Sequence, residues 1–200
     1  MSDLATVAIY TTRSDAEIVR ARLVSDGIDA IVIADDEGGL NPGFYASYGV
    51  RVVVAGSDLA AAHATLDLDV VIMPEEAQAE MIEHARAVAP NEACGLVAGL
   101  DGVVTKVYKL TNLDGAPDRF TLDPAEHFAA IRDAEASGWA IVGAFHSHPS
   151  SAPVPSAADL AGGSDPGWVN LIVGVEGGRV ALRAYRYDDG GATAVEIKPR

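Results

Sequence analysis

Residues 143–159 read Gly-Ala-Phe-His-Ser-His-Pro-Ser-Ser-Ala-Pro-Val-Pro-Ser-Ala-Ala-Asp, and they hold two of the five histidines of this 200-residue chain. The apolar run that leads into His146, residues 139–145, has the length of a β-strand. Residues i and i+2 of a strand point to the same side, so His146 and His148 would leave the strand end directed at one point. The stretch therefore predicts a strand that ends in two convergent histidines.

The same stretch supplies a third potential metal ligand. Two imidazoles and a carboxylate are a common ligand set for zinc, with water in the open fourth position. His146, His148 and Asp159 supply that set, and the proline-rich segment between them can turn the chain back. Ser156 and Asp159 are three residues apart, so both would lie on one face of a helical turn. That spacing is also typical of a capping box, which needs no metal, and the two interpretations are compatible.

Zinc chemistry also needs a base for the attacking water, and Glu92 is the candidate. It begins a predicted strand over residues 92–99 and precedes Cys94 and Gly95, where glycine lets another segment approach closely. An isolated glutamate is most often a surface acid, and Cys94 is most often a small buried apolar residue.

Around this stretch, residues 73–200 predict a mixed β-sheet with flanking helices, an α+β fold. Pro74 can open a helix at its first turn. Apolar periodicity and turn signals predict helices at 75–89, at 123–136 and from 156. They predict strands at 92–99, 103–110, 120–122, 139–146, 169–175, 180–187 and 192–197.

Residues 1–72 predict a separate small α+β domain with the order βαββα. The expected elements are strands at 6–10, 28–34 and 50–55 and helices at 15–25 and 57–66, with a glycine-rich loop at 35–48. Residues 35–37, Asp-Asp-Glu, could bind a cation, although adjacent acids usually form a solvated loop. No residue here has a catalytic pattern, so the domain is either a binding or regulatory module or a packing appendage.

Composition excludes several classes of protein. An apolar content of 49% and a charged content of 22% are typical of a soluble globular chain. The net charge of −15 repels phosphate backbones and anionic membrane surfaces, which argues against nucleic-acid and membrane partners. A single cysteine allows no internal disulfide, and no stretch has the length of a membrane span or the pattern of a signal peptide. We therefore expect a cytoplasmic protein.

The whole pattern, Glu92 followed by His146-x-His148-Pro149-x6-Ser156-x2-Asp159, resembles that of the JAMM (MPN-type) metalloproteases over about residues 75–198. The resemblance implies a JAMM, cytidine-deaminase-like mixed sheet and zinc held by His146, His148 and Asp159. It implies Glu92 as general base and then general acid, and Ser156 as a donor to the tetrahedral oxyanion.

Within that family the chain is similar to small bacterial members that act on ubiquitin-like sulfur-carrier proteins. The matching stretches are residues 84–86, 90–95, 111–112, 145–148 and 182–185. These relatives imply hydrolysis of the amide that joins a carrier's C-terminal Gly-Gly to cysteine or lysine. Residues 1–72 resemble a bacterial accessory domain described as a signal-transducing protein.

Three alternatives stay open from the sequence. A RadC-type protein associated with DNA repair shares the spacing, but it typically has Asn where this chain has Ser147, and the charge argues against DNA. A binding or regulatory protein could recognise a carrier tail without cutting it. A hydrolase of small acyl-cysteine or peptide substrates is the third. The sequence does not indicate the carrier, the leaving group or the oligomeric state.

Overall fold

The computed structural model describes residues 4–10, 12–34, 50–66, 70–100, 103–162, 167–176, 178–188 and 191–200. They form two compact units. The first contains the described residues before Val70 together with Gly167, and the second contains the rest. Among the described helices, none combines the length and apolar character needed to cross a membrane.

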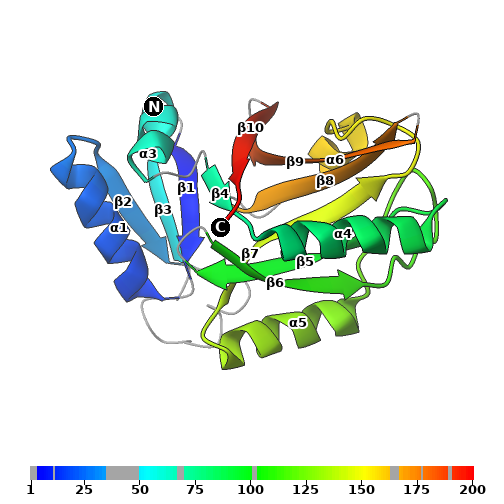
Figure 1. The fold of residues 1–200 in the computed structure, drawn as a ribbon. Helices are drawn as coiled ribbons and strands as arrows, with labels where there is room; N and C mark the ends of the chain where they lie inside the picture. The colour runs from blue at the N-terminus through cyan, green and yellow to red at the C-terminus, as the bar shows by residue number, and fades with distance from the viewer. Residues whose placement is uncertain are drawn as a thin grey trace. The chain divides into compact units, whose positions relative to one another are not determined.

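The first unit is a three-stranded antiparallel sheet packed against two helices (Figure 1). Its core consists of alanine and valine side chains from the sheet, Ala16 and Leu23 from the first helix, and Ala62 from the second helix. The predicted βαββα order is confirmed, and the loop predicted at 35–48 lies outside the described residues. The elements are β1 (Leu4–Tyr10), α1 (Arg13–Ser25), β2 (Ala30–Ala34), β3 (Val50–Ala55), the 3-10 turn η2 (Gly56–Asp58) and α3 (Leu59–Thr65), and the strand order is β1-β3-β2.

The second unit is a seven-stranded sheet that closes on itself. The strand order is β10-β4-β6-β5-β7-β8-β9, and β10 also pairs with β9. The elements are β4 (Val70–Ile72), α4 (Glu75–Val88), β5 (Cys94–Leu100), β6 (Val103–Leu110), α5 (Pro124–Ala136), β7 (Ala140–His148), α6 (Ala157–Gly162), β8 (Val169–Glu176), β9 (Arg179–Asp188) and β10 (Gly191–Lys198).

The predicted mixed sheet with flanking helices is confirmed, with two differences. The strand predicted at 120–122 is a single bridge between Asn112 and Leu122. Strand β4 was not predicted, because three residues are too short to show strand alternation. Its parallel pairing with β10 and β6 closes the sheet and assigns Val70–Ile72 to the second unit, whereas the predicted boundary followed residue 72.

The two faces of β7 pack against different apolar clusters. Phe145 is fully buried in a core that it shares with α4, where Met81 and Leu171 also lie. The neighbouring Ala144 faces the cluster under α5. Because side chains alternate along a strand, His146 and His148 lie on the same side of the sheet as Ala144, at the end of β7.

Close packing at β5 fixes this arrangement. A Cβ atom on Gly95 would overlap the Tyr108 carbonyl and the Phe145 ring. The sequence-based expectation that Gly95 permits a close approach is therefore confirmed, and the segment that approaches is the histidine strand itself.

Candidate metal centre

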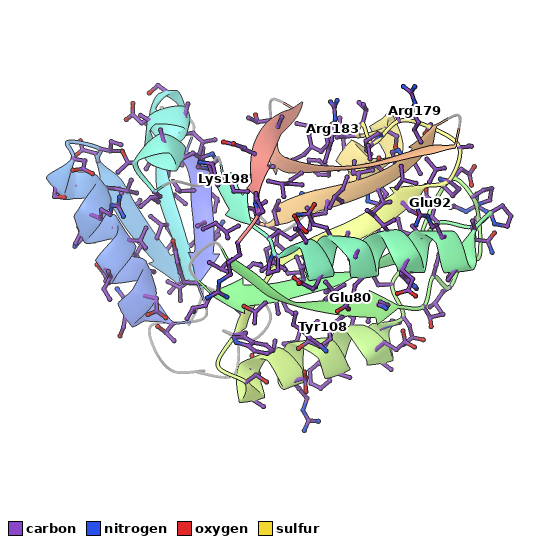
Figure 2. The ribbon with its side chains drawn as sticks, viewed as in Figure 1. Glu80, Glu92, Tyr108, Arg179, Arg183 and Lys198 are labelled. Carbon is purple, nitrogen blue, oxygen red and sulfur yellow. The ribbon has the colours of Figure 1, made fainter. Side chains whose placement is uncertain are left out.

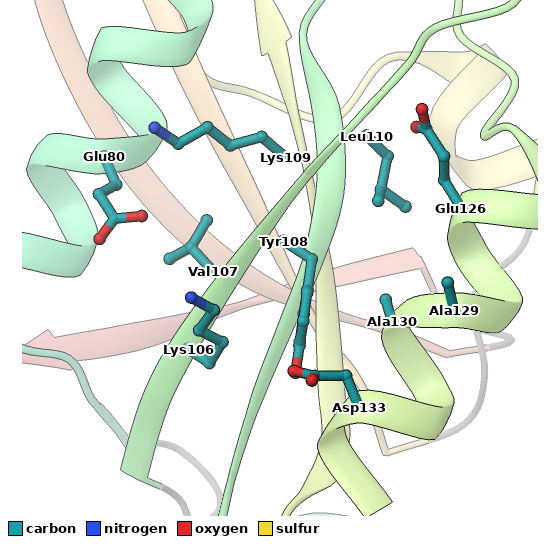
Figure 3. A pocket seen from close by; sticks show the side chains of 10 residues that line it. All are labelled: Glu80, Lys106, Val107, Tyr108, Lys109, Leu110, Glu126, Ala129, Ala130 and Asp133. Carbon is teal, nitrogen blue, oxygen red and sulfur yellow. The ribbon is translucent and has the colours of Figure 1, made fainter. Parts of the chain in front are cut away.

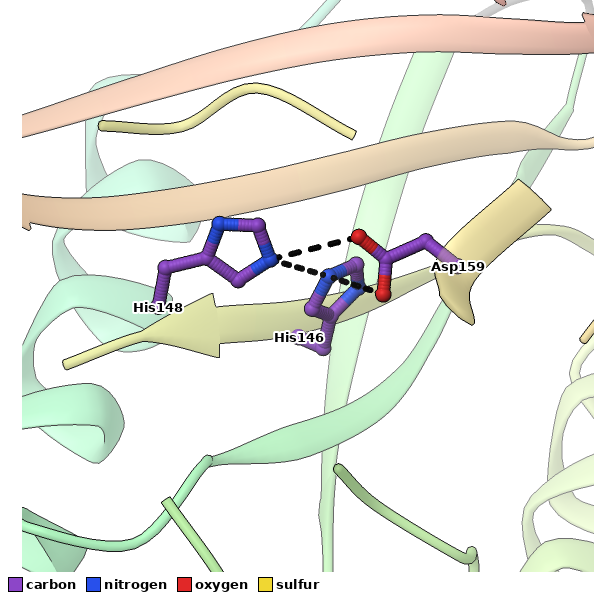
Figure 4. Close-up of side chains that lie close together, drawn as sticks. All are labelled: His146, His148 and Asp159. Atoms are coloured by element: carbon purple, nitrogen blue, oxygen red, sulfur yellow. Dashed lines mark hydrogen bonds and ion pairs between the residues drawn. The ribbon is translucent and has the colours of Figure 1, made fainter. Parts of the chain in front are cut away.

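The side chains of His146, His148 and Asp159 converge at the end of β7 (Figure 4). The two Nε2 atoms are 3.1 Å apart. Asp159 Oδ1 lies 3.4 Å from His146 Nε2, and Asp159 Oδ2 lies 3.3 Å from His148 Nε2. In the part of the chain that the structure describes, this is the one group of three potential ligands of this kind.

Contacts with neighbouring protein groups hold both imidazole rings in place. The ring nitrogen Nδ1 of His148 lies 3.1 Å from the Ala152 carbonyl oxygen, which can only accept, so Nδ1 carries the proton and Nε2 faces Asp159 with a lone pair when the ring is neutral. The His146 ring stacks on Phe120, with centroids 4.9 Å apart and planes at 22°. Both histidines are buried. Their orientation is therefore set by protein contacts.

Asp159 is presented by a capping box at the start of α6. The Ser156 N–H donates to Asp159 Oδ2 at 2.6 Å, and the Asp159 N–H donates to Ser156 Oγ at 3.1 Å. The predicted capping box is thus confirmed, and its carboxylate is the same group that faces the two histidines. Because Ser156 Oγ accepts a bond from the backbone, its own O–H remains able to donate elsewhere.

The loop between β7 and α6 is fastened to the barrel. The buried Tyr185 hydroxyl of β9 donates to the Pro153 carbonyl at 2.8 Å. On β8, a Cβ atom at Gly174 would overlap Pro153, so this glycine lets the loop lie directly on the strand. These contacts bring α6, and with it Asp159, back over the strand end.

Glu92 belongs to the same face as the histidines. The Ala93 N–H donates to Ser147 Oγ at 2.8 Å, and the Ser147 N–H donates to the Ala93 carbonyl at 3.0 Å. Cys94 pairs with His146, and continuing this register two residues past the last pair places Glu92 opposite His148. Figure 2 labels Glu92 near the C-terminal half of α4. Sequence reasoning used Ser147 only to separate protein families, and it missed the bonds that tie this residue to the Glu92 segment.

The electrostatics of Glu92 suit proton transfer near neutral pH. Its side chain is only 4% exposed. Burial raises its pKa to about 7, the positive charge of His148 opposes this shift, and the negative charges of Asp159 and Asp118 add to it. A carboxyl group with this pKa can both take up and release a proton at physiological pH.

The two facing groups are shifted toward their charged forms. Burial favours the neutral form of Asp159, but hydrogen bonds from His146, His148 and the Ser156 N–H outweigh it and lower the pKa of Asp159. Burial likewise disfavours charge on His148, but the bonds to Asp159 and to the Ala152 carbonyl outweigh it and raise the pKa of His148. Asp159 is therefore an anion at neutral pH.

Cys94 has no place in this chemistry. Its thiol is buried and contacts the Leu110 carbonyl, and burial raises its pKa to about 12. A thiol in this state is not a nucleophile at neutral pH. The interpretation of Cys94 as a small buried apolar residue is confirmed.

A separate groove of about 500 Å³ runs along β6 between α4 and α5 (Figure 3). None of the five predicted site residues lines it. The candidate metal centre is therefore an arrangement at a strand end and not the floor of this groove. The groove is lined by Glu80, Lys106, Val107, Tyr108, Lys109, Leu110, Glu126, Ala129, Ala130 and Asp133.

Comparison with known families agrees with this geometry. The family of prokaryotic homologs of the JAB domain (Prok-JAB) matches residues 74–187. The chain belongs to this family. The Prok-JAB match confirms the predicted JAMM-type resemblance of the second unit. It begins at residue 74, so the predicted resemblance of the first unit stays a prediction.

Two curated relatives and one solved structure are similar to part of the chain. The desampylase of Haloferax volcanii is 38% identical over 109 residues, which are 51% of this chain and 78% of the relative. The CysO-cysteine peptidase of Mycobacterium tuberculosis is 32% identical over 116 residues, 56% of this chain and 80% of the relative. The solution structure of protein DSY2949 from Desulfitobacterium hafniense is 36% identical with a TM-score of 0.60, covering 65% of this chain and 92% of that one.

Proposed function

We propose that this Prok-JAB protein is a zinc-dependent hydrolase that cleaves the amide after the C-terminal Gly-Gly of a ubiquitin-like or sulfur-carrier protein, releasing cysteine or a lysine side chain. The observation that carries the proposal is the convergence of His146, His148 and Asp159 beside the buried Glu92. The names of the relatives support the substrate class, since one is a desampylase and another a CysO-cysteine peptidase. We assign hydrolysis to the second unit and substrate binding or regulation to the first, and we expect the protein to act in the cytoplasm.

The donor set fits zinc. Zinc bound by nitrogen and oxygen ligands at about 2.0–2.1 Å in a tetrahedron has neighbouring ligand atoms about 3.3 Å apart. The two histidine Nε2 atoms are 3.1 Å apart, and each lies close to a different oxygen of the Asp159 carboxylate: His146 Nε2 is 3.4 Å from Oδ1 and His148 Nε2 is 3.3 Å from Oδ2. The Ala152 carbonyl behind His148 is the outer-shell partner that a ligating imidazole usually has. We therefore assign His146, His148 and Asp159 as the ligands.

Bound zinc would supply a Lewis acid that lowers the pKa of water to about 7 and polarises the scissile carbonyl. Glu92 then has two tasks. Its carboxylate takes the proton of the attacking water, and the resulting carboxylic acid passes that proton to the departing amine. A pKa of about 7 suits both steps, because neither protonation state is strongly favoured at neutral pH.

Ser156 has the remaining task. Its Oγ is fixed by the Asp159 N–H, so the position of the hydroxyl does not depend on substrate. We assign its O–H as the donor to the oxyanion that forms when water adds to the carbonyl. A donor fixed in advance stabilises the charge that develops in the transition state without reorganisation during the reaction.

Mass spectrometry of a carrier adduct tests this proposal. The wild-type protein, loaded with zinc, is incubated with a Gly-Gly-tailed carrier joined to cysteine, and cleavage is followed by the loss of cysteine mass. Glu92→Gln should keep about one zinc per chain and lose about 10²–10⁴-fold in kcat, because glutamine cannot accept the proton. Glu80→Gln, an exposed position on α4, is the matched control and should keep full activity.

Two outcomes would reject parts of the proposal. Stable binding of the adduct by zinc-loaded wild-type protein without cleavage would favour a recognition protein over a hydrolase. Full activity of Glu92→Gln would show that another group removes the proton.

A further inference from the structure

The loop between β6 and α5, residues 111–123, is organised by the side chain of Asn112. Its Nδ2 donates to the carbonyls of Glu92 and Arg119, each at 3.1 Å. Its Oδ1 accepts from the backbone N–H of Asp114 at 3.0 Å and of Thr121 at 3.2 Å. An amide side chain offers two donors and one oxygen with two lone pairs, so all of its hydrogen-bonding capacity is used.

Three of these four bonds stay inside the loop, but the fourth leaves it for the Glu92 carbonyl. The loop contacts Glu92 a second time, because the Glu92 N–H donates to the Ala116 carbonyl at 2.8 Å. Both backbone polar groups of Glu92 are thus bonded to this loop. The next residue, Ala93, is bonded instead to Ser147 of β7.

The same loop reaches the metal centre from another side. Phe120 stacks on the His146 ring. It directly precedes Thr121, whose backbone N–H donates a hydrogen bond to Asn112 Oδ1. The start of the loop has its own anchor, since the Glu126 carboxylate accepts bonds from the Thr111 N–H at 2.6 Å and from its hydroxyl at 3.0 Å. The start of the loop is therefore held in place without the hydrogen bond from Asn112 to Glu92.

We propose that Asn112 is a positioning residue that couples Glu92 to His146 through loop 111–123. Its amide holds the backbone of Glu92 on one side and the segment that carries Phe120 on the other. The proposal rests on the proposed function, because Glu92 needs exact placement only if it transfers protons there. Misplacing a reacting group by about 1 Å can cost about 100-fold in rate, which is the scale of effect expected when this coupling is lost.

Asn112→Asp tests the coupling with a side chain of the same shape. The substitution keeps one oxygen for the N–H groups of Asp114 and Thr121 and turns the other toward the Glu92 and Arg119 carbonyls, which cannot donate. We expect kcat on the carrier adduct to fall about 10- to 100-fold, with KM within about twofold of wild type and zinc content unchanged. A residue that only stabilised the fold would not produce this split.

Amide hydrogen exchange of the metal-free protein gives a readout that needs no activity. In Asn112→Asp the Glu92 amide, bonded to the loop, should exchange about tenfold faster than in wild type. The Ala93 amide, bonded to Ser147, should keep its wild-type rate. If the aspartate variant does not fold, Asn112→Ser makes the same test without adding a charge.

Thr121→Val is the matched control. It removes the bond from the Thr121 hydroxyl to Asp114, 2.7 Å, from the same loop and leaves the side chain of Asn112 unchanged. Its kcat and its Glu92 exchange rate should equal those of wild type. The proposal would be overturned if Asn112→Asp kept both the kcat and the Glu92 amide exchange rate of the wild-type protein. It would also be overturned if Thr121→Val lost as much kcat and as much protection of the Glu92 amide as Asn112→Asp. Absence of hydrolysis by the wild-type protein would instead reject the proposed function, and the exchange rates alone would then decide whether Asn112 holds Glu92.

Discussion

The candidate metal centre has two halves that are built differently. His146 and His148 come from the end of β7, Glu92 lies two residues before β5, and all three are at most 7% exposed. Ser156 and Asp159 come from the first turn of α6, a six-residue helix with no buried residue. We call these the strand half and the helix half.

Different forces hold the two halves. In the strand half the two histidines are fixed by sheet register, because β7 pairs with β5 on one side and with β8 on the other, and Glu92 is held by its backbone bonds to loop 111–123. The helix half has no sheet to align it and relies on a few local bonds, namely the capping box and the Tyr185 bond to the loop. A short exposed helix can therefore supply a well-placed ligand only while those bonds are intact, since isolated short helices are marginal in water.

The largest effect should come from the strand half. His146→Ala removes a buried side chain that we propose as a zinc ligand and that the helix half cannot replace. We expect the zinc content to fall from about one per chain to near zero. Loss of a residue that only hydrogen-bonds a metal ligand costs roughly 10–100-fold in activity, and the loss of a ligand itself should cost more. Metal analysis after gel filtration measures this. His127→Ala on α5 is the control, and full zinc content in His146→Ala would mean that the ligand set is wrong.

The next effect separates two roles of Ser156 in the helix half. Ser156→Gly and Ser156→Ala both remove the hydroxyl, so kcat should fall about 10²–10³-fold in both if that hydroxyl donates to the oxyanion. At a helix N-cap alanine costs about 1 kcal/mol and glycine only a few tenths, so zinc affinity should drop more in the alanine variant. Ser156→Thr keeps both functions. If Ser156→Gly keeps the wild-type kcat, the Ser156 hydroxyl does not donate to the oxyanion, and the only role of this side chain is to cap α6.

A third prediction concerns the burial of the strand half and its pH dependence. Burial raises the pKa of Glu92 from 4.5 to about 7, so the folded state binds a proton more tightly than the unfolded state. The stability that Glu92 contributes is complete below pH 4.5 and is lost as the pH rises through about 7. Relative to Glu92→Gln, metal-free wild type should lose up to about 3 kcal/mol in the free energy of unfolding over this range. Urea unfolding with a chelator at several pH values measures the difference, and a pH-independent difference contradicts it.

The smallest effect tests how the helix half is fastened. Tyr185→Phe leaves the Pro153 carbonyl without its buried donor, which should cost about 1–3 kcal/mol and weaken zinc binding. Tyr108→Phe makes the same chemical change at an exposed bond to Asp133 and should stay within about 0.5 kcal/mol. Urea unfolding of both variants compares them. Equal stabilities would mean that the loop is held by packing on Gly174 and not by the hydroxyl.

The sequence predicts the local features of both halves and misses the bonds between segments that are distant in sequence. The helix half is local in sequence, and the Ser156–Asp159 spacing alone indicates its capping box. The histidine pair is local too, because strand alternation directs two residues to one side. The roles of Ser147 and Asn112 were missed, since their partners lie 54 and 20 residues away and no spacing rule connects them.

The sequence by itself determined the order of the elements, the ligand types and the family, because periodicity, turn residues and a dense motif are properties of neighbouring residues. Only the tertiary structure decided that β4 closes the sheet, that Glu92 lies opposite His148, and that loop 111–123 bonds Glu92 while stacking Phe120 on His146. Each of these depends on pairing between segments distant in sequence, and burial follows from that pairing. The burial that raises the pKa of Glu92 to about 7 is therefore a property of the fold, whereas the glutamate itself is a property of the sequence.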